Sequence, residues 1–405
     1  MSVGQSSQSV GYALSPSFDT QVMARNHLEI ASVIKRYGAE FRMQCSPNNY
    51  QLTILNALQQ CRTAELGGHK DKCDSCGEEQ YSYNSCGNRH CPKCQIARQM
   101  LWAEDRMRDS LGVKHFHIVF TVPDELNPIC MADSLFFYES LFACAKETLC
   151  AFGYSHYGVE TGAISVLHTW GQNLNLHPHL HCIVPAVGIT PRGQLKEIGS
   201  QGKYLYPVRQ LSVTFRGKLL EALKRNLKKK NRLPEFQSVI DHCYAKPWVV
   251  YTEPSLGNAR QVVNYLAKYT HRVAISNSRI KNMDSNGVTF SYKDYADNAN
   301  QKLMTLTGVE FLRRFAMHIL PRGFVKIRYF GILTSAYREQ VKSLKTKPDI
   351  FQLTETRQQR LVRLTGFDPC KCPKCKTGTL HPVELLPRVR SPDNVFYPRT
   401  MNLNQ

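Results

Sequence analysis

Eight cysteine and histidine residues crowd into the 34 residues from Cys61 to Cys94, and no other part of the sequence constrains the fold as strongly. They form four pairs, which are Cys61/His69, Cys73/Cys76, Cys86/His90 and Cys91/Cys94. Two cysteines separated by two residues can chelate one tetrahedral ion from a tight turn. Eight ligands match two zinc ions, which would tie together a loop-rich segment that has little hydrophobic core of its own.

The spacing of these eight ligands leaves two arrangements open. In a cross-braced arrangement, the first and third pairs bind one zinc ion, and the second and fourth pairs bind the other. In the alternative, Cys73, Cys76, Cys91 and Cys94 bind a single zinc ion, and the other four residues are structural. Zinc modules serve DNA recognition, protein contact or folding alone, and the spacing does not distinguish these roles.

Cysteine usage and charge indicate the cellular compartment in which the protein works and the class of partner that it binds. The sequence has 15 cysteines, no long apolar run, and a Ser/Gly/Gln-rich start without a signal-peptide core. It therefore predicts a cytoplasmic protein whose cysteines bind metal rather than form disulfides, and no membrane contact. Lysine and arginine outnumber aspartate and glutamate by 52 to 32. This excess suits a protein that follows a phosphate backbone, although charge alone does not distinguish DNA from RNA.

A different metal-binding pattern lies in the stretch His177-Pro178-His179-Leu180-His181, which leads into a run of apolar residues typical of a buried strand. Because side chains alternate along a strand, His179 and His181 point to the same side, and the apolar residues between and after them face a core. Two such imidazoles can converge on a divalent ion. Paired histidines in a strand are more often hydrogen-bonded core residues, so this pattern alone does not establish a metal site.

Further along the chain, the segment 264–270 reads Asn-Tyr-Leu-Ala-Lys-Tyr-Thr and is rich in helix formers. In a helix, Tyr265 and Tyr269 lie on one face because they are four residues apart, and Lys268 lies next to that face. Taken alone, such a tyrosine pair more often packs half-buried against a sheet.

Together, the two patterns resemble the HUH endonucleases of rolling-circle replication and transposition. In that class, an ion held by a His-hydrophobe-His strand activates a DNA phosphodiester for attack by a tyrosine on a helix. Here 179–181 matches the histidine motif, and 265–269 matches the two-tyrosine motif Tyr-x-x-Lys-Tyr. The flanking residues 167–176 and 269–277 narrow the resemblance to the rolling-circle transposases of the insertion sequence ninety-one family. The similarity extends from near Cys45 to the carboxyl-terminal cysteines.

The resemblance implies an enzyme that acts on single-stranded transposon ends and target DNA. Tyr265 or Tyr269 would attack the scissile phosphate and form a 5'-phosphotyrosine, with Lys268 as a further catalytic residue. Arg272 could neutralise the phosphate or pair with an acidic neighbour. The sequence contains no Gly-x-x-x-x-Gly-Lys-[Ser/Thr] loop, so we expect a host helicase or the replication machinery to unwind the DNA.

The catalytic ion implied by the resemblance, Mg²⁺ or Mn²⁺, needs more ligands than His179 and His181. Gln172 is the preferred third ligand because it precedes the metal strand and offers a neutral oxygen. The alternatives are His168 and His177. A rival pattern, His115-Phe116-His117, is ranked second because its flanks resemble the family's opening strand, and His117 remains a candidate for lining the site.

The order of the expected elements predicts an α+β protein whose HUH catalytic domain is an antiparallel sheet with helices on one face. Near the carboxyl terminus, a zinc knuckle is possible, although its Cys-x-Cys spacing is unusually short. Its ligands would be Cys370, Cys372, Cys375 and His381. The expected units are a mobile leader (1–18), a helical and zinc-binding DNA-recognition module (19–112), the HUH catalytic domain (113–335) and a carboxyl-terminal region (336–405).

Two other functions remain compatible with the sequence. A rolling-circle replication initiator or a relaxase would use the same chemistry on other DNA substrates. A zinc-dependent DNA-binding regulator without catalytic activity would need neither tyrosine. A transposase of this kind would work in the bacterial cytoplasm, in association with the nucleoid.

Overall fold

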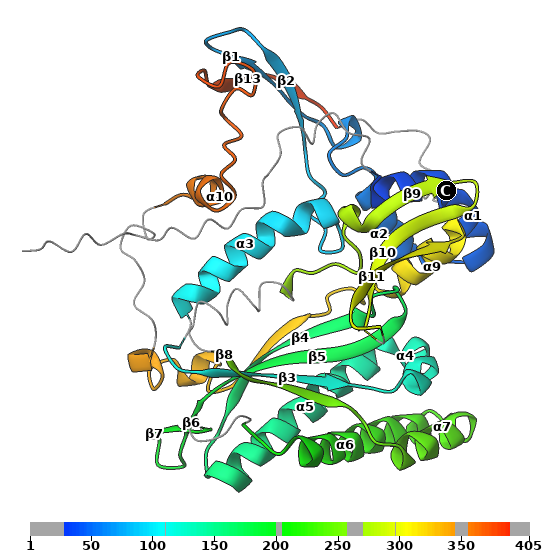
Figure 1. Ribbon diagram of the computed structural model, residues 1–405, viewed down its shortest axis with the longest axis vertical. Helices are drawn as coiled ribbons and strands as arrows, with labels where there is room; N and C mark the ends of the chain where they lie inside the picture. The colour runs from blue at the N-terminus through cyan, green and yellow to red at the C-terminus, as the bar shows by residue number, and fades with distance from the viewer. Residues whose placement is uncertain are drawn as a thin grey trace, which may run out of the picture.

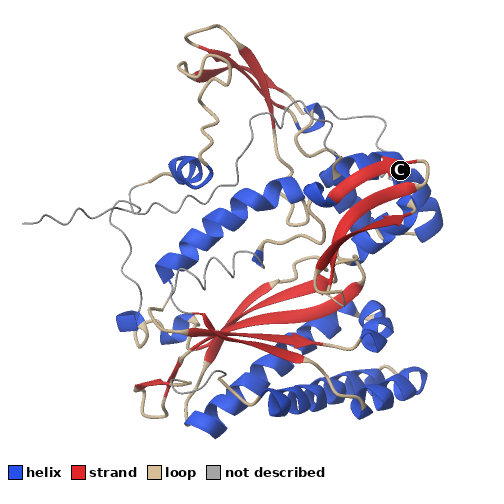
Figure 2. Cartoon of the chain, in the orientation of Figure 1, coloured by secondary structure: helices blue, strands red, loops and turns tan. Residues whose placement is uncertain are grey.

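The computed structural model describes residues 28–109, 111–199, 205–256, 270–295, 297–344 and 355–388, with only the backbone described in 106–109 and 254–256. Helices and antiparallel strands both contribute to it (Figure 2), so the expected α+β class is confirmed. A five-stranded sheet forms its centre, and smaller sheets lie beyond it (Figure 1).

The central sheet is antiparallel and has the strand order β12-β4-β5-β3-β8. Its strands are β12 (Ile327–Gly331), β4 (Gly162–Trp170), β5 (Leu176–Pro185), β3 (His115–Thr121) and β8 (Val250–Leu256). Phe120, Leu167 and Leu180 from the three middle strands are fully buried in one core. Apolar residues recur at alternate positions because one side of each middle strand faces a layer of helices.

Helices cover this side of the central sheet (Figure 1). They are α4 (Asn127–Ala132), α5 (Ser134–Tyr157), α6 (Val208–Lys229) and α7 (Leu233–Ala245). The Asp133 side chain begins α5 by accepting a hydrogen bond from the backbone N–H of Phe136, and Gly158, with φ of 67°, ends it. The helix α3 (Pro92–Asp109) runs on the other side of the sheet. The candidate site lies on the side of the sheet that faces away from the helical layer.

A second core joins the beginning of the described chain to its later part. It packs α1 (Ile30–Cys45) and α2 (Asn49–Gln59) against α9 (Gly308–Met317) and a three-stranded antiparallel sheet. The strands of that sheet are β9 (Ile280–Asp284), β10 (Gly287–Asp294) and β11 (Asn300–Leu306). The amino-terminal helices therefore share a core with residues that follow the expected tyrosines in the chain.

The contact between α1 and α9 depends on Gly308, because a Cβ atom there would lie 2.1 Å from the Tyr37 ring. The Tyr37 hydroxyl donates to the backbone carbonyl of Asp284 at 2.7 Å, which holds the ring in place.

Gly308→Ala is expected to lower the free energy of unfolding by about 1–3 kcal/mol, measured by urea denaturation. In Gly217→Ala the added Cβ meets nothing within 4 Å, so this control should gain about 0.5–1 kcal/mol. Equal stability of the two variants would contradict this account.

The small sheet in the zinc-binding region combines distant parts of the chain. The strand β1 (Gly68–Cys73) pairs with β2 (Glu79–Tyr83) on one side and with β13 (Leu380–Leu386) on the other. The helix α10 (Arg357–Thr365) lies beside α3, where Arg360 Nε donates to Glu104 at 2.6 Å. The last described residues therefore return to the amino-terminal region (Figure 1).

The remaining elements are short. The strands β6 (Val187–Ile189) and β7 (Leu195–Glu197) form a hairpin after β5. The single-turn 3-10 helices are η2 (Ala64–Leu66), η3 (Asp124–Leu126), η4 (Asn277–Arg279), η5 (Ser335–Tyr337) and η6 (Lys342–Leu344).

Candidate active site and zinc sites

Three histidines from two neighbouring strands gather on the side of the central sheet that faces away from the helical layer. His179 and His181 alternate along β5 with Leu180 and Cys182, which are buried in the main core. The antiparallel register places His168 of β4 opposite His179. One ring nitrogen from each of the three histidines lies within 4.8 Å of the others. Imidazole nitrogens at this separation can share one divalent ion.

Neighbouring groups fix the orientation of two of these rings. His179 Nδ1 lies 2.7 Å from the backbone carbonyl oxygen of His177. That contact places the proton on Nδ1 and leaves Nε2 of His179 to bind a metal. The His168 ring stacks on the Trp170 indole, with ring centroids 4.8 Å apart and planes 20° from parallel.

His117 supports the cluster from the third strand, β3. Its ring stacks on that of His181, and its Nε2 lies 2.9 Å from His181 Nδ1. On the other side, His117 Nδ1 lies 3.2 Å from the Glu253 carboxylate on β8. His115 instead points its Nδ1 at the Val113 carbonyl at 2.8 Å. Of the rival histidine pair, His117 therefore contacts the cluster, whereas His115 contacts the backbone just before its own strand.

Burial keeps His179 and His181 neutral. It lowers the pKa of His179 to about 4, and the neighbouring His177 lowers that pKa further. Burial is also the main cause that holds the pKa of His181 well below its ordinary value, and the neighbouring His179 lowers that pKa further. Metal ions bind the neutral form of imidazole, so His179 and His181 are in their ligand form at neutral pH.

The structure favours His168 over Gln172 as the third ligand. Gln172 lies in the turn between β4 and β5, beyond the paired strands that carry the cluster. His177 is partly exposed, and its Nδ1 lies 3.3 Å from the Asp124 carboxylate. The strand register explains why His168 and not Gln172 lies in the cluster. It pairs His168 with His179, whereas Gln172 lies beyond the last paired residues of β4 and β5.

The expected nucleophiles Tyr265 and Tyr269, together with Lys268, lie outside the described residues. The described chain leaves the central sheet at the end of β8 and resumes at Thr270. Two residues later, Arg272 is exposed and lines a pocket next to the Trp170 indole.

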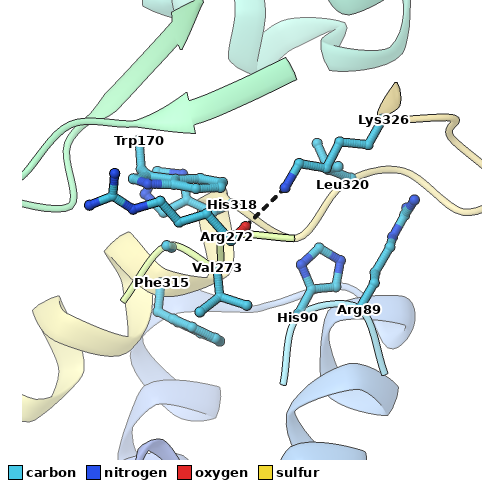
Figure 3. A pocket seen from close by; sticks show the side chains of 10 residues that line it. Arg89, His90, Trp170, Arg272, Val273, Phe315, His318, Leu320 and Lys326 are labelled. Atoms are coloured by element: carbon cyan, nitrogen blue, oxygen red, sulfur yellow. Dashed lines mark hydrogen bonds between the residues drawn. The ribbon is translucent and has the colours of Figure 1, made fainter. Parts of the chain in front are cut away.

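This pocket is cationic (Figure 3), and it adjoins the histidine cluster through Trp170, which stacks on His168. It is lined by Arg89, His90, Trp170, Arg272, Val273, Ala274, Phe315, His318, Leu320 and Lys326. The Lys326 ammonium donates to the backbone carbonyl of Arg272 at 2.9 Å and lies 5.1 Å from the centre of the Trp170 ring. Burial, and then the charges of Arg89 and Arg272, lower the pKa of Lys326 to about 7. Positive charge concentrated in this way suits an anionic oxygen.

Four cysteines form a tetrahedral site between α2 and the start of α3. They are Cys61, Cys86, Cys91 and Cys94. The sulfur of Cys61 lies 3.6 Å from that of Cys94 and 3.5 Å from that of Cys91, and the Cys86 and Cys94 sulfurs are 3.7 Å apart. Four thiolates at about 2.3 Å from a zinc ion lie about 3.8 Å from one another. One zinc ion therefore fits among these sulfurs.

The two histidines of the expected zinc ligand set lie elsewhere. His69 Nε2 is 3.3 Å from the carboxylate of the buried Asp71 on the same strand, β1. His90 lines the cationic pocket, where its Nε2 is buried without a hydrogen-bond partner in the described part of the chain. Burial lowers the pKa of His90 to about 3, so its ring is neutral.

The other cysteines of the predicted zinc sites are grouped in neither of the arrangements that the spacing predicts. Cys73 and Cys76 lie next to Cys372 and Cys375, so the expected carboxyl-terminal knuckle is divided. The Cys370 sulfur accepts a hydrogen bond from Gln358 Nε2 at 3.0 Å. His381 Nε2 lies 3.5 Å from the Asp74 carboxylate. Local spacing missed this grouping because a strand pairing across nearly the whole chain brings the two cysteine pairs together.

Comparison with known proteins identifies the family. A family model described as "Transposase zinc-binding domain" matches residues 33–122, and one described as "Putative transposase" matches residues 162–340. The "Putative transposase y4qJ" of Sinorhizobium fredii (strain NBRC 101917 / NGR234) is 38% identical over 392 residues, which cover 91% of this chain and 98% of that protein. The chain belongs to the IS91 family of transposases.

A second relative of this IS91-family transposase is the "Transposase for insertion sequence element IS801" of Pseudomonas savastanoi pv. phaseolicola. It is 31% identical over 301 residues, which cover 70% of each chain. No solved structure matches the chain. The family resemblance drawn from the motifs is confirmed, and with it a transposase that acts on DNA and carries an amino-terminal zinc-binding domain. Among the described helices, none is long and apolar enough to cross a bilayer.

Proposed function

We propose that this IS91-family transposase cleaves and rejoins single-stranded DNA through a 5'-phosphotyrosine intermediate during rolling-circle transposition. The observation that carries the proposal is the cluster of His168, His179 and His181 beside a cationic pocket. An HUH site requires a metal-binding strand next to a place for phosphate, and these two features adjoin here through the Trp170 ring.

The donor set of the cluster fits a catalytic divalent ion. Of the two ions expected from the sequence, Mn²⁺ suits three nitrogen donors better than Mg²⁺, which prefers oxygen ligands. When bound, such an ion supplies Lewis-acid polarisation of the scissile phosphate. His117 and Glu253 orient His181 for this task through their hydrogen-bonded contacts.

The pocket offers the groups that a phosphodiester needs. Arg272 is exposed and can form charge-assisted hydrogen bonds with phosphate oxygens. The buried Nε2 of His90 faces no protein partner among the described residues and is open to a ligand group. Lys326 offers a hydrogen-bond donor beside Trp170 and adds positive charge when it is protonated. Together these groups would hold the strand and offset the negative charge that develops during transfer.

The cleavage step follows from the nature of the nucleophile. The phenol oxygen of Tyr265 or Tyr269 attacks phosphorus, the bond from phosphorus to the 3' oxygen breaks, and the phenolic proton ends on that departing oxygen. A tyrosine hydroxyl ordinarily titrates near a pKa of about 10, so nearby positive charge favours its ionisation. One phosphodiester replaces another, which makes the step reversible without ATP. The second tyrosine can then cleave a second strand while the first remains linked.

Single-stranded transposon ends and target DNA are the substrates in this mechanism. The sequence has no Gly-x-x-x-x-Gly-Lys-[Ser/Thr] loop that would bind ATP for unwinding. A host helicase or the replication machinery would therefore expose the strands, and the protein would act in the cytoplasm at the nucleoid.

Mapping the covalent intermediate tests the proposal on the unaltered protein. Single-stranded oligonucleotides that tile both ends of the element are incubated with the protein and Mn²⁺, and the denatured adduct is digested and analysed by mass spectrometry. We expect a nucleotide linked through its 5' phosphate to Tyr265 or Tyr269. DNA cleaved without an adduct, or an adduct on any other residue, would refute the mechanism.

A further inference from the structure

We propose that Cys73, Cys76, Cys372 and Cys375 bind a second zinc ion, which fastens the carboxyl-terminal part of the chain to the zinc-binding domain. Cys73 is the last residue of β1, Cys76 lies in the turn that leads to β2, and Cys372 and Cys375 lie in the loop before β13. The zinc-binding family model covers residues 33–122, so half of this site lies far outside the matched domain. The inference does not depend on the tyrosine chemistry.

The sulfur positions match tetrahedral zinc. The Cys73 and Cys375 sulfurs are 3.7 Å apart, as are those of Cys76 and Cys372, and all four lie within 4.8 Å of one another. The edge of a tetrahedron with zinc–sulfur bonds of about 2.3 Å is about 3.8 Å. A disulfide would bring two sulfurs to about 2.05 Å, so these cysteines are arranged as metal ligands and not as bridges.

The backbone around the four sulfurs is also arranged for a metal. Each half of the site is a Cys-x-x-Cys turn, the spacing from which two thiolates chelate one ion. The backbone N–H of Gly378 donates to the Cys375 sulfur at 3.3 Å, a contact that stabilises a thiolate ligand. A Cβ atom on Gly378 would lie 2.4 Å from the Cys73 sulfur, so the close approach of the two turns requires glycine.

Without a metal, this region has little to hold it together. Its buried core consists of Cys73, Cys372 and Leu380, with Cys375 partly buried beside them. The ion pair between Lys374 and Glu78 is on the surface, where such pairs contribute little. The pairing of β13 with β1 therefore lacks the apolar burial that a sheet of this size needs, and a zinc ion supplies the missing cross-link.

Zinc analysis of purified variants separates this site from the alternatives. We expect two zinc ions in the wild-type chain, one in Cys372→Ser/Cys375→Ser, and one in Cys73→Ser/Cys76→Ser. The variant with all four changes should also hold one, because each pair serves the same ion. Cys370→Ser is the matched control and should keep two, since its sulfur contacts Gln358 instead of the cluster. A single zinc in the wild type, two in Cys372→Ser/Cys375→Ser, or a loss in Cys370→Ser would each overturn the proposal.

Alkylation of the wild-type protein provides a measurement that does not depend on the folding of variants. Cys76 is exposed, so burial alone does not protect its side chain, whereas a bound metal would. With zinc present, we expect iodoacetamide to modify Cys370 and to spare the four proposed ligands. A chelator should then make all four reactive together, as read by peptide mass spectrometry. Rapid modification of Cys76 in the zinc-replete protein would overturn the proposal.

Discussion

Replacing Tyr265 and Tyr269 together by phenylalanine is expected to abolish covalent protein–DNA adducts on single-stranded oligonucleotides. Phenylalanine keeps the ring and removes the attacking oxygen, so the loss should be at least about 10³-fold in the rate of adduct formation. DNA affinity should change little, because the positively charged surface and the zinc-binding domain are untouched. Adducts are measured by denaturing gel electrophoresis, and affinity by fluorescence anisotropy.

The single variants Tyr265→Phe and Tyr269→Phe complete this experiment. If each tyrosine performs one of the two cleavages, each single variant still forms an adduct in a single cleavage step, and strand transfer to a second oligonucleotide fails. A double variant that still forms adducts would rule out both residues as nucleophiles. A double variant that retains every activity would favour the non-catalytic regulator.

The second large effect is expected from the metal-binding strand. In His179→Gln/His181→Gln, two of the three clustered nitrogens are lost, and with them the ion that polarises the phosphate in the proposed mechanism. Metal-ion catalysis contributes several kcal/mol, so a loss of about 4 kcal/mol corresponds to roughly a 10³-fold slower formation of the adduct. The rate is measured against Mn²⁺ concentration. We expect saturation in the wild type and no metal dependence in the double variant.

His115→Gln is the matched control for the metal-binding strand. His115 is a buried histidine of the same sheet, and burial lowers its pKa to about 4, as it does for His179. Its ring contacts the Val113 carbonyl instead of the cluster, so the variant should cleave DNA within about threefold of the wild type. Zinc content reports on folding in both variants. Equal loss in the two variants would show that the sheet, and not the ion, had been disturbed.

Discrimination among HUH functions depends on the substrate. A replication initiator or a relaxase would rejoin the cleaved strand to its own origin, whereas a transposase must join it to an unrelated target. Membership in the IS91 family favours transposition. Strand transfer from a transposon end to an unrelated single-stranded oligonucleotide, catalysed by the purified protein, is the assay that distinguishes the two.

Local patterns in the sequence predicted much of the central sheet and part of its site. Alternation from His179 to Val184 predicted a strand with histidines on one side and a core on the other, and β5 has this arrangement. Local patterns also favoured Gln172 over His168 as the third ligand, because they carry no information about strand register. Opposition of His168 to His179 is a property of the β4–β5 ladder.

The zinc ligands show more clearly which contacts residue spacing in the sequence does not predict. Adjacent cysteines and histidines in the chain suggested local pairs, yet the structure leaves out His69 and His90 and adds cysteines from the far end of the chain. The signal was present as a second Cys-x-x-Cys at 372–375, matching the one at 73–76. Its partner could not be identified from spacing, because the two turns meet only through the pairing of β13 with β1.

The sequence by itself determined the chemistry available to this transposase: imidazoles on one side of a strand, paired tyrosines, cysteine pairs that chelate zinc and an excess of positive charge. The tertiary structure alone decided which of these groups meet. It placed His168 in the cluster, His117 and Glu253 behind it, and the cationic pocket beside it. The physical reason is that residue type and local periodicity fix what a side chain can do and which way it points, whereas contacts between distant segments depend on strand register and on the burial of shared cores.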